Sequence, residues 1–324
     1  MPIDHATCTR ALSACHEDGL VKRGWARRLQ RAATNGDVTE LRLLLSCNKR
    51  LPGAVDLLDL PDDFTPLHIA ALHGNADCIR VLSEAGASLN LRRGDDAGFA
   101  PLHLAAHQGH VNCVQVLCEV GAGINQSGVS GITPLCVAVH QGQAECLRLL
   151  CEAGAAVNKV ADAGVTPLWM AALQGHTVCA HILSSYGARD ETAAAAARRG
   201  GHVKLADWLR CAQAWTPLHH LEVLTPARAL SLLRGGADLH TGSPSPLERA
   251  RTVPGEVSAL VVHAGRRWSP QTHHLFPATA RSYAVEVLRL GYLLAWSPRY
   301  TGEASSLVDV WLGYVLPHMM ERGS

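Results

Sequence analysis

The stretch APLHLAAHQGHVNCVQVLCEVGA, residues 100–122, decides the fold, because three other stretches of the chain repeat it almost letter for letter. The other copies begin at Thr65, Thr133 and Thr166, so the four starting points are separated by 35, 33 and 33 residues. A period of this length is typical of helical repeats that stack on one another. Repeat arrays serve as binding proteins more often than as enzymes, so the period favours a binding function.

Each copy carries the signals for two short helices. In the third copy, Thr133 is suited to the N-cap and Pro134 to the first turn, where its missing amide hydrogen has no consequence. Gly142 ends that helix, because glycine adopts a left-handed conformation without strain. A second helix is predicted over 144–152, and Gly154 ends it. Two such helices cannot bury their apolar faces alone, so stability must come from stacking each pair on the next.

The letters shared by the copies resemble the ankyrin repeat. The second copy supplies all of them: Pro101-Leu102-His103, Ala105-Ala106, Gly109-His110, Val116-Leu117, Gly121-Ala122 and Asn125. The resemblance implies an all-α ankyrin-repeat solenoid of helix-turn-helix repeats joined by hairpin loops, and the helical patterning that continues after the repeats predicts a C-terminal helical cap. It also implies a non-enzymatic protein-protein interaction module or scaffold that binds partner proteins through its concave surface.

Weaker copies flank the four clear ones. Upstream, Ala32-Ala33 and Leu43-Leu44-Leu45 keep the helical letters without the TPLH motif, and downstream the motif restarts at Thr216 and again at Ser245. We predict an N-terminal segment over 1–25, an ankyrin-repeat domain over 26–265 and a C-terminal helical unit over 266–324. Within the domain, the clear repeats are expected at about 62–94, 95–127, 128–160 and 161–190, and the degenerate repeats at about 26–60, 191–212, 213–242 and 243–265.

Two sets of positions are candidates for partner binding. In the resembled family partners dock on the concave side, and the resemblance places there the two residues before each repeat glycine. The residue just before each motif threonine or alanine forms a second, apolar column. Such a column either docks a partner or packs sideways and stiffens the loops, and both interpretations stay open. The candidate residues are Phe64, Leu72, His73, Phe99, His107, Gln108, Ile132, His140, Gln141, Val165, Leu173, Gln174 and Trp215.

Eleven cysteines raise the question of disulfides. Cys78, Cys113, Cys146 and Cys179 each lie four residues after a repeat glycine, so they form one column of the array. Neighbouring repeats pack roughly 8–10 Å apart, whereas a disulfide needs Cα atoms within about 7 Å. The column is therefore predicted to hold buried, reduced thiols, which indicates the cytoplasm, the nucleus or both.

The histidines are explained mostly by the repeat itself. The resemblance gives hydrogen-bonding roles to the histidines of the TPLH and GH motifs. His107 and His140 could approach each other across a repeat, but two ligands without a nearby Asp, Glu or Cys make a poor metal site. We therefore expect no metal site. The motif histidines are His68, His103, His110, His176, His202 and His219.

The chain lacks the motifs of common catalytic and cofactor sites, including G-x-S-x-G, H-E-x-x-H and the P-loop. No catalytic residue and no cofactor are therefore expected. A net charge of +1 predicts no general attraction to nucleic acid or membrane. The partners are expected to be one or more proteins, and the chain is expected to be monomeric by itself. One basic cluster is either a nuclear-import patch or, as we prefer, the solvated face of a terminal helix: Lys22, Arg23, Arg27, Arg28 and Arg31.

The last segment, 266–324, keeps helical patterning after the repeat letters stop. The positions of Leu307, Trp311 and Tyr314 predict an amphipathic helix. This unit either caps the solenoid or recruits a second protein, which would make the chain the substrate-recognition adaptor of a ubiquitin ligase. We favour capping, because the start of a SOCS box or an F-box cannot be aligned with these residues.

Overall fold

The computed structural model is all-helical in the part of the chain that it describes, with fifteen α-helices, four short 3-10 turns and no strand. The fold class predicted from the repeat letters is confirmed. The described residues are 19–47, 54–56, 64–94, 97–162, 164–265, 273–276, 278–279, 281–282 and 285.

The chain divides into two compact units, and each is described by itself. The first unit comprises residues 1–183 and 188–209, and the second comprises 184–187 and 210–324. The helices of the first unit come in pairs. The second helix of the fifth pair and the second helix of the sixth pair each extend a few residues into the second unit. The paired helices are α2 (Gly19–Asn35), α3 (Val38–Cys47), α4 (Pro66–His73), α5 (Ala76–Glu84), α6 (Pro101–Gln108), α7 (Val111–Glu119), α8 (Pro134–His140), α9 (Ala144–Glu152), α10 (Pro167–Gln174), α11 (Thr177–Ser185), α12 (Ala193–Arg199) and α13 (Val203–Ala212).

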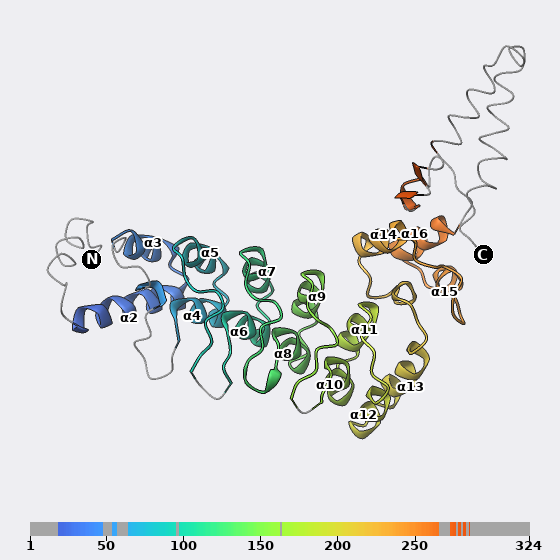
Figure 1. The fold of residues 1–324 in the computed structure, drawn as a ribbon, viewed down its shortest axis with the longest axis horizontal. Coiled ribbons are helices and arrows are strands. Elements are labelled where there is room, and N and C mark those ends of the chain that lie inside the picture. The colour runs from blue at the N-terminus through green and yellow to red at the C-terminus, as the bar shows by residue number, and fades with distance from the viewer. Residues whose placement is uncertain are drawn as a thin grey trace, which may run out of the picture. The chain divides into compact units, whose positions relative to one another are not determined.

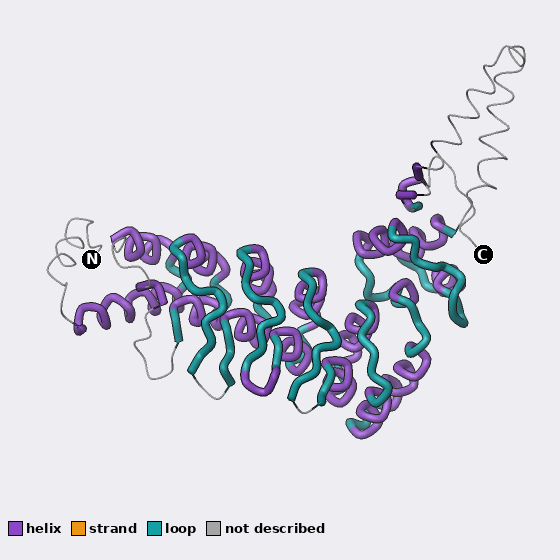
Figure 2. The backbone as a smooth tube through the Cα atoms, in the orientation of Figure 1, coloured by secondary structure: helices purple, strands orange, loops and turns teal. Residues whose placement is uncertain are grey.

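In the first unit, the first helix of each pair packs against the first helix of the next pair, and the second helices from α3 to α9 pack on one another in the same way (Figure 1). We call the row formed by α2, α4, α6, α8, α10 and α12 the inner row, and the row formed by α3, α5, α7 and α9 the outer row. The described parts of the loops that join one pair to the next lie on the same side of the stack (Figure 2). This stacking buries the apolar faces that a single pair would leave in water.

The inner helices that begin at a motif threonine start where the sequence predicts. Thr65, Thr133 and Thr166 are N-caps whose hydroxyl groups accept a hydrogen bond from an amide three residues later, and a proline follows each of them. Gly74 follows α4 with a φ of 83°, a left-handed conformation that costs most other residues strain. The leucine after each proline is buried, as are the two small apolar residues one turn later.

Two motif histidines of the first unit, His68 and His103, join their repeats to the next. The amide of Thr65 donates to Nδ1 of His68, so the ring carries its proton on Nε2, and Nε2 donates to the carbonyl of Phe99 at 3.2 Å. His103 contacts the carbonyl of Ile132 at the same distance. These rings are therefore part of the junctions between repeats.

The first repeat is degenerate in sequence but makes the same kinds of contact. Its helix α2 begins at Gly19, earlier than the boundary predicted at residue 26. Gln30 replaces the motif histidine, since its Nε2 donates to the carbonyl of Phe64 at 3.0 Å. In the turn η1 (Ala54–Asp56), the carboxylate of Asp56 accepts a bond from the amide of Ser88 at 3.0 Å. Different residues thus preserve the junction.

A second set of bonds runs backwards between repeats, from residues that follow a repeat glycine. Nε2 of His110 contacts the carbonyl of Leu72 at 3.0 Å, and Nε2 of His176 contacts the carbonyl of His140 at 3.2 Å. The ring of His110 lies so close that a Cβ atom added to Gly74 would approach its Nδ1 to 2.9 Å. Glycine is therefore needed here for space as well as for conformation.

A third set of bonds lies in the loops. Oδ1 of Asn90 accepts from the amide of Gly123 at 2.6 Å, and Oδ1 of Asn125 accepts from the amide of Ala156 at 2.7 Å. In the same way, Oδ1 of Asn158 accepts from the amide of Arg189 at 3.1 Å. The asparagine that closes each copy in sequence therefore fixes the loop of the following copy.

The second unit begins with the restarted motif, which forms only the 3-10 turn η3 (Pro217–His219) where a first helix was expected. The residues after His219 lack the small apolar pair and the glycine, and Thr225 already caps α14 (Pro226–Arg234). Because the residue before a proline disfavours the helical conformation, a helix from residue 217 could not continue through this point. The predicted repeat over 213–242 thus contains one turn and one helix.

Helices α14, α15 (Pro246–Thr252) and α16 (Glu256–Ala264) share one apolar core in the second unit. The turn η4 (His273–Leu275) packs on this core, because Leu275 and Phe276 are buried in it and Nε of Arg234 donates to the carbonyl of His274 at 3.1 Å. These four residues behave as a cap. Apart from residues 278–279, 281–282 and 285, the rest of 266–324, including the helix predicted around Trp311, lies outside the described residues, so both roles suggested for it stay predictions.

Candidate functional site

The paired candidates before each glycine lie at the C-terminal ends of inner-row helices. The second member of each pair is exposed. The first member is half-buried in three of the repeats, and the exception is His140, which is exposed. Because the repeats stack in register, the same two positions recur along the row. We call this set the inner ridge: Leu72, His73, His107, Gln108, His140, Gln141, Leu173 and Gln174.

Side-chain contacts within the inner ridge cross from one repeat to the next. Nε2 of Gln141 donates to Nε2 of His107 at 2.9 Å. The sequence suggested an approach between His107 and His140, whereas the hydrogen bond at this junction comes from the neighbouring glutamine. His73 instead contacts the carbonyl of Ile69, in its own helix, at 3.0 Å. The ridge is therefore a polar surface with some internal order.

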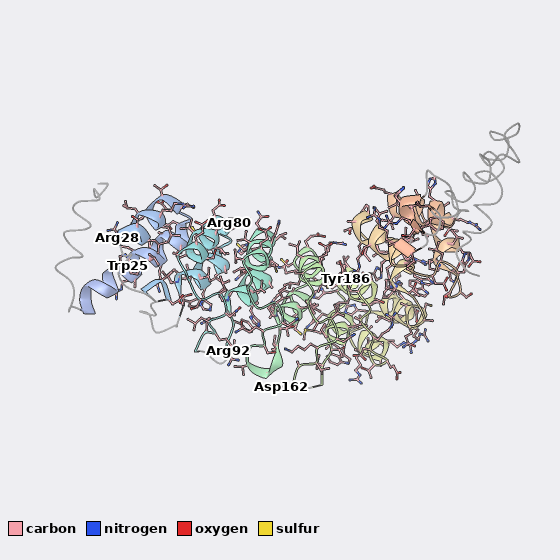
Figure 3. The ribbon with its side chains drawn as sticks, turned by 45° about the horizontal axis from the view of Figure 1, so that its top comes forward. Trp25, Arg28, Arg80, Arg92, Asp162 and Tyr186 are labelled. Atoms are coloured by element: carbon pink, nitrogen blue, oxygen red, sulfur yellow. The ribbon has the colours of Figure 1, made fainter. Side chains whose placement is uncertain are left out.

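Charge is distributed unevenly between the inner and the outer helices of the four clear repeats. Helices α4, α6, α8 and α10 contain no Asp, Glu, Lys or Arg. The outer row carries ion pairs between repeats, with Arg80 2.9 Å from Glu119 and Arg42 3.6 Å from Glu84 (Figure 3 labels Arg80). These exposed pairs contribute little stability. The inner ridge is therefore distinguished by neutral hydrogen-bonding groups.

The apolar column before each motif threonine makes contacts with its own loops. The ring of Phe64 meets His68 edge to face, and the guanidinium carbon of Arg93 lies 3.8 Å from its centroid. Phe99 stacks on His103 with ring centroids 5.2 Å apart. Like these two residues, Ile132 and Val165 are half-buried. Such contacts are the ones that stiffening requires, and docking at this column stays a prediction.

Trp215, the last member of that column, lies in the second unit. Its side chain is only 8 % exposed, its ring stacks on His219, and the guanidinium of Arg249 lies 4.3 Å from its centroid. The same guanidinium also pairs with Glu222 at 2.6 Å. The structure thus gives Trp215 a packed environment and places it in a different unit from the other candidates.

Three of the motif histidines, His68, His103 and His219, are buried. Burial lowers the pKa of His68 and that of His103 from 6.5 to about 4, and it also lowers the pKa of His219. Each ring makes hydrogen bonds through both nitrogens. These histidines serve the fold, as the resemblance implied.

The cysteine column is also part of the core. Cys78, Cys113, Cys146 and Cys179 are free and buried. Burial raises the pKa of Cys113 to about 12 and the pKa of each of the other three to about 11. Such thiols stay protonated and unreactive at neutral pH, so they act as packing residues.

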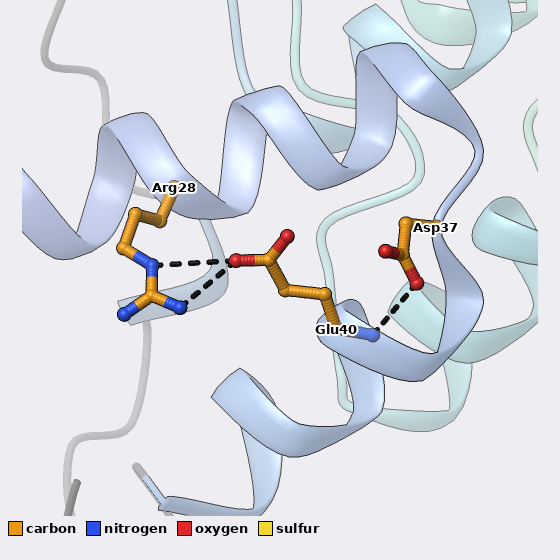
Figure 4. A network of polar contacts seen from close by, with 3 residues as sticks. All are labelled: Arg28, Asp37 and Glu40. Atoms are coloured by element: carbon orange, nitrogen blue, oxygen red, sulfur yellow. Dashed lines mark hydrogen bonds and ion pairs between the residues drawn. The ribbon is translucent and has the colours of Figure 1, made fainter. Parts of the chain in front are cut away.

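Arginines of the first helix are solvated or paired locally. Nη2 of Arg28 lies 2.9 Å from Oε1 of Glu40, and the amide of Glu40 donates to Asp37 (Figure 4). Arg27 and Arg31 are exposed. These observations fit the solvated face of a terminal helix.

Two further positions extend the inner ridge, and the repeat letters did not reveal them. The amide of His202 donates to the carbonyl of Ala197, as the amide of His176 does to Ala171, so exposed Arg199 occupies the position of Leu173. By the corresponding register in α2, Asn35 occupies the position of His73. An alignment anchored on the alanines of the degenerate copies would have found both.

No group of three or more His, Cys, Asp or Glu side chains is placed to hold a metal ion within the ranges that the structure describes. None of the described helices has both the length and the apolar character needed to span a membrane.

Comparison with protein families agrees with the geometry. A family model that describes three copies of the ankyrin repeat matches residues 29–128 and 122–194. This range begins in α2, ends in α12 and includes 166 of the 324 residues. No curated protein matches the chain. The repeat period, the paired helices and this match show that the chain belongs to the ankyrin-repeat family.

Proposed function

We propose that the first unit binds a partner protein on its inner ridge and works as a non-enzymatic interaction module or scaffold. Ankyrin repeats are generally protein-protein interaction modules. The observation that carries the proposal is the recurrence of two solvent-accessible positions in four successive repeats, at helix ends that the repeat fixes by other residues. A surface of this kind can vary in sequence without loss of the fold.

The mechanism would be rigid display. The residue after a repeat glycine bonds to the end of the preceding inner helix, as His110 does, and the TPLH histidine joins the start of its helix to the next repeat, as His68 does. Because the ridge is ordered before binding, a partner pays little for ordering this surface. Affinity would then depend mainly on the fit of the partner to the ridge.

The chemistry of the described residues supports a non-enzymatic role. Catalysis by histidine or cysteine requires a group whose pKa lies near the working pH and which a substrate can reach. His68 and His103 are buried with lowered pKa values, and the thiols of the cysteine column are buried with raised ones. Reduced thiols in the core also support a reducing compartment, the cytoplasm or the nucleus.

The test compares two multiple variants of the full chain. The ridge variant carries His107→Ala, Gln108→Ala, His140→Ala and Gln141→Ala, and the control carries Glu84→Ala, Glu119→Ala and Glu152→Ala on the outer row. Proteins bound to each chain would be identified by affinity purification with mass spectrometry, and the affinity of each purified partner would then be measured by calorimetry.

We expect the control to keep its partners and the ridge variant to lose at least one of them, with unchanged circular dichroism. Retention of every partner by the ridge variant, together with loss by the control, would place the binding surface on the outer row.

A further inference from the structure

The second position of the inner ridge forms a column of uncharged hydrogen-bonding side chains. His73, Gln108, Gln141 and Gln174 occupy the same position in four successive repeats, and all four are exposed. Asn35 occupies it in the first repeat. We call these five residues the amide column, although one member is an imidazole. An amide side chain has two donors and an accepting oxygen, so it can bond either kind of main-chain group.

Most of the hydrogen-bonding capacity of this column is not used within the fold. The side chains of Gln108 and Gln174 make no hydrogen bond to another described residue, and Gln141 uses one amide hydrogen on His107. By contrast, the residues after each glycine, such as His110 and Asn75, are bonded to carbonyl groups of the preceding repeat. The amide column is thus available to a partner, whereas its neighbours are committed to the stack.

From this arrangement we propose that the inner ridge binds an extended, polyproline II-like peptide segment of the partner through its main chain. The inference rests on the proposed function. A helical segment satisfies its own backbone groups, so it would leave the amides without main-chain partners. A polyproline II segment has no internal hydrogen bonds, and its carbonyl and amide groups are free to bond the column.

The repeat distance matches the period of such a segment. Neighbouring helices pack roughly 8–10 Å apart, and a polyproline II helix turns once in three residues with a rise of about 3.1 Å each, about 9 Å per turn. One residue in three would therefore face each successive repeat in the same orientation. A β-strand alternates its faces every two residues, so its backbone groups would not stay in phase with the column.

The residues at the first position of the inner ridge indicate which side chains the bound segment should carry. Leu72 and Leu173 lie at its two ends, with His107 and His140 between them. The two leucines are three repeats apart, a distance that about nine extended residues would cover. We expect apolar side chains at both ends of this span. The inner helices from α4 to α10 carry no formal charge, so the segment need not be strongly charged.

The experiment selects random peptides of about twelve residues, displayed on phage, for binding to the immobilised full chain. Affinities of the selected peptides are then measured by fluorescence anisotropy for the chain, for an amide variant (Gln108→Ala, Gln141→Ala and Gln174→Ala) and for the outer-row control (Glu84→Ala, Glu119→Ala and Glu152→Ala). We expect the amide variant to lose about tenfold or more in affinity, since three hydrogen bonds are removed, and the control to lose less than about twofold.

Scans of the peptide test its conformation. Alanine substitution should lower affinity at positions spaced by three, and proline substitution between them should change affinity by less than about threefold, because proline fits polyproline II and breaks an α-helix. Loss at every proline together with sensitivity at spacings of three and four would identify a helical partner and overturn the inference. An unchanged affinity of the amide variant, or no enrichment of any peptide, would also overturn it.

A further variant separates this inference from the proposed function. If Leu72→Asp with Leu173→Asp abolishes peptide binding while the amide variant binds normally, the ridge is the binding surface but does not bind the main chain. If neither variant changes the affinity of selected peptides, both proposals fail. Circular dichroism of each variant at 222 nm confirms that the comparison is made between folded chains.

Discussion

The motifs at Thr65 and at Thr216 have the same letters, Thr-Pro-Leu-His, yet they produce different structures in the two units. The first begins helix α4, and the second forms only the turn η3. In both places the histidine accepts from the amide of the threonine and contacts a carbonyl further along the chain. The difference arises afterwards, where the first unit has two alanines and a glycine and the second has an early proline. A helix start thus fixes a junction, while the residues after it decide the length of the helix.

The largest expected effect comes from the buried leucines, Leu102 of α6 and Leu218 of η3. Both are almost completely buried. Leu102→Ala and Leu218→Ala should each lower the free energy of unfolding by about 2–5 kcal/mol, because each truncation leaves a cavity. Urea unfolding would measure the loss. If Leu218→Ala lowered the free energy of unfolding by only a few tenths of a kcal/mol while Leu102→Ala had its full effect, η3 would contribute far less to its core than α6 does.

The next effect concerns pH and the histidine junctions of the first unit. The pKa of His68 is about 4 in the folded chain and 6.5 in a free side chain. The unfolded chain therefore binds more protons between these values, and stability that is present above pH 6.5 is lost as the pH falls toward 4. We expect His68 and His103 to cost about 2–3 kcal/mol each at pH 4.5.

The natural control for this pH effect is the first repeat, where Gln30 makes the corresponding bond without a titratable group. His68→Gln should keep much of the bond. Urea unfolding at pH 7 and pH 4.5 should then show that the loss of stability attributed to His68 and His103 is about half as large as in the unchanged chain. An unchanged pH dependence in His68→Gln would assign the acid sensitivity to other groups.

A smaller effect is expected at the caps. The hydroxyl of Thr133 accepts from the amide of Cys136 at 3.2 Å, and no motif histidine is present in that repeat. Thr133→Ala should therefore cost about 1 kcal/mol. In Thr216→Ala the amide of residue 216 would still donate to His219, so the cost should be only about half as large. Thermal unfolding of the two variants tests the order, and a reversal would mean that the histidine contributes little to capping.

The smallest effect on stability is expected at the ridge. Replacing His107, Gln108, His140 and Gln141 together by alanine removes exposed side chains and one exposed hydrogen bond, so the free energy of unfolding should change by less than about 1 kcal/mol. Calorimetry gives the measurement. A collapse of stability would show that the ridge is structural and would remove the basis for using it as a binding surface.

Sequence reasoning predicted most of the first unit because local rules determine it. The helix over 144–152 was predicted from apolar spacing and is observed over the same residues. The start of α2 was not predicted, since Gly19 carries no N-cap signal. The replacement of the motif histidine by Gln30 was also missed, because the amide reaches a carbonyl more than thirty residues away. Bonds of that kind become visible only when repeats are placed side by side.

The candidate site shows the same limit. The register of the repeats predicted which positions recur, and the structure places the ridge residues at equivalent helix ends. It did not predict that Gln141 would bond to His107, because the choice depends on side-chain reach across the junction. The short turn at His219 was missed for a different reason: the TPLH letters were given more weight than the proline that follows.

The loop asparagines have a consequence for how such a chain can change in length. Asn90 and Asn125 each accept from an amide in the next copy, while His110 and His176 each reach a carbonyl in the previous one. The boundary joined by Asn90 and His110 therefore uses one side chain from each of its two neighbours. Loss or duplication of one whole period brings together two ends that already match, whereas a cut of any other length leaves both side chains without their targets. Duplication of complete modules is thus the change that this architecture tolerates best.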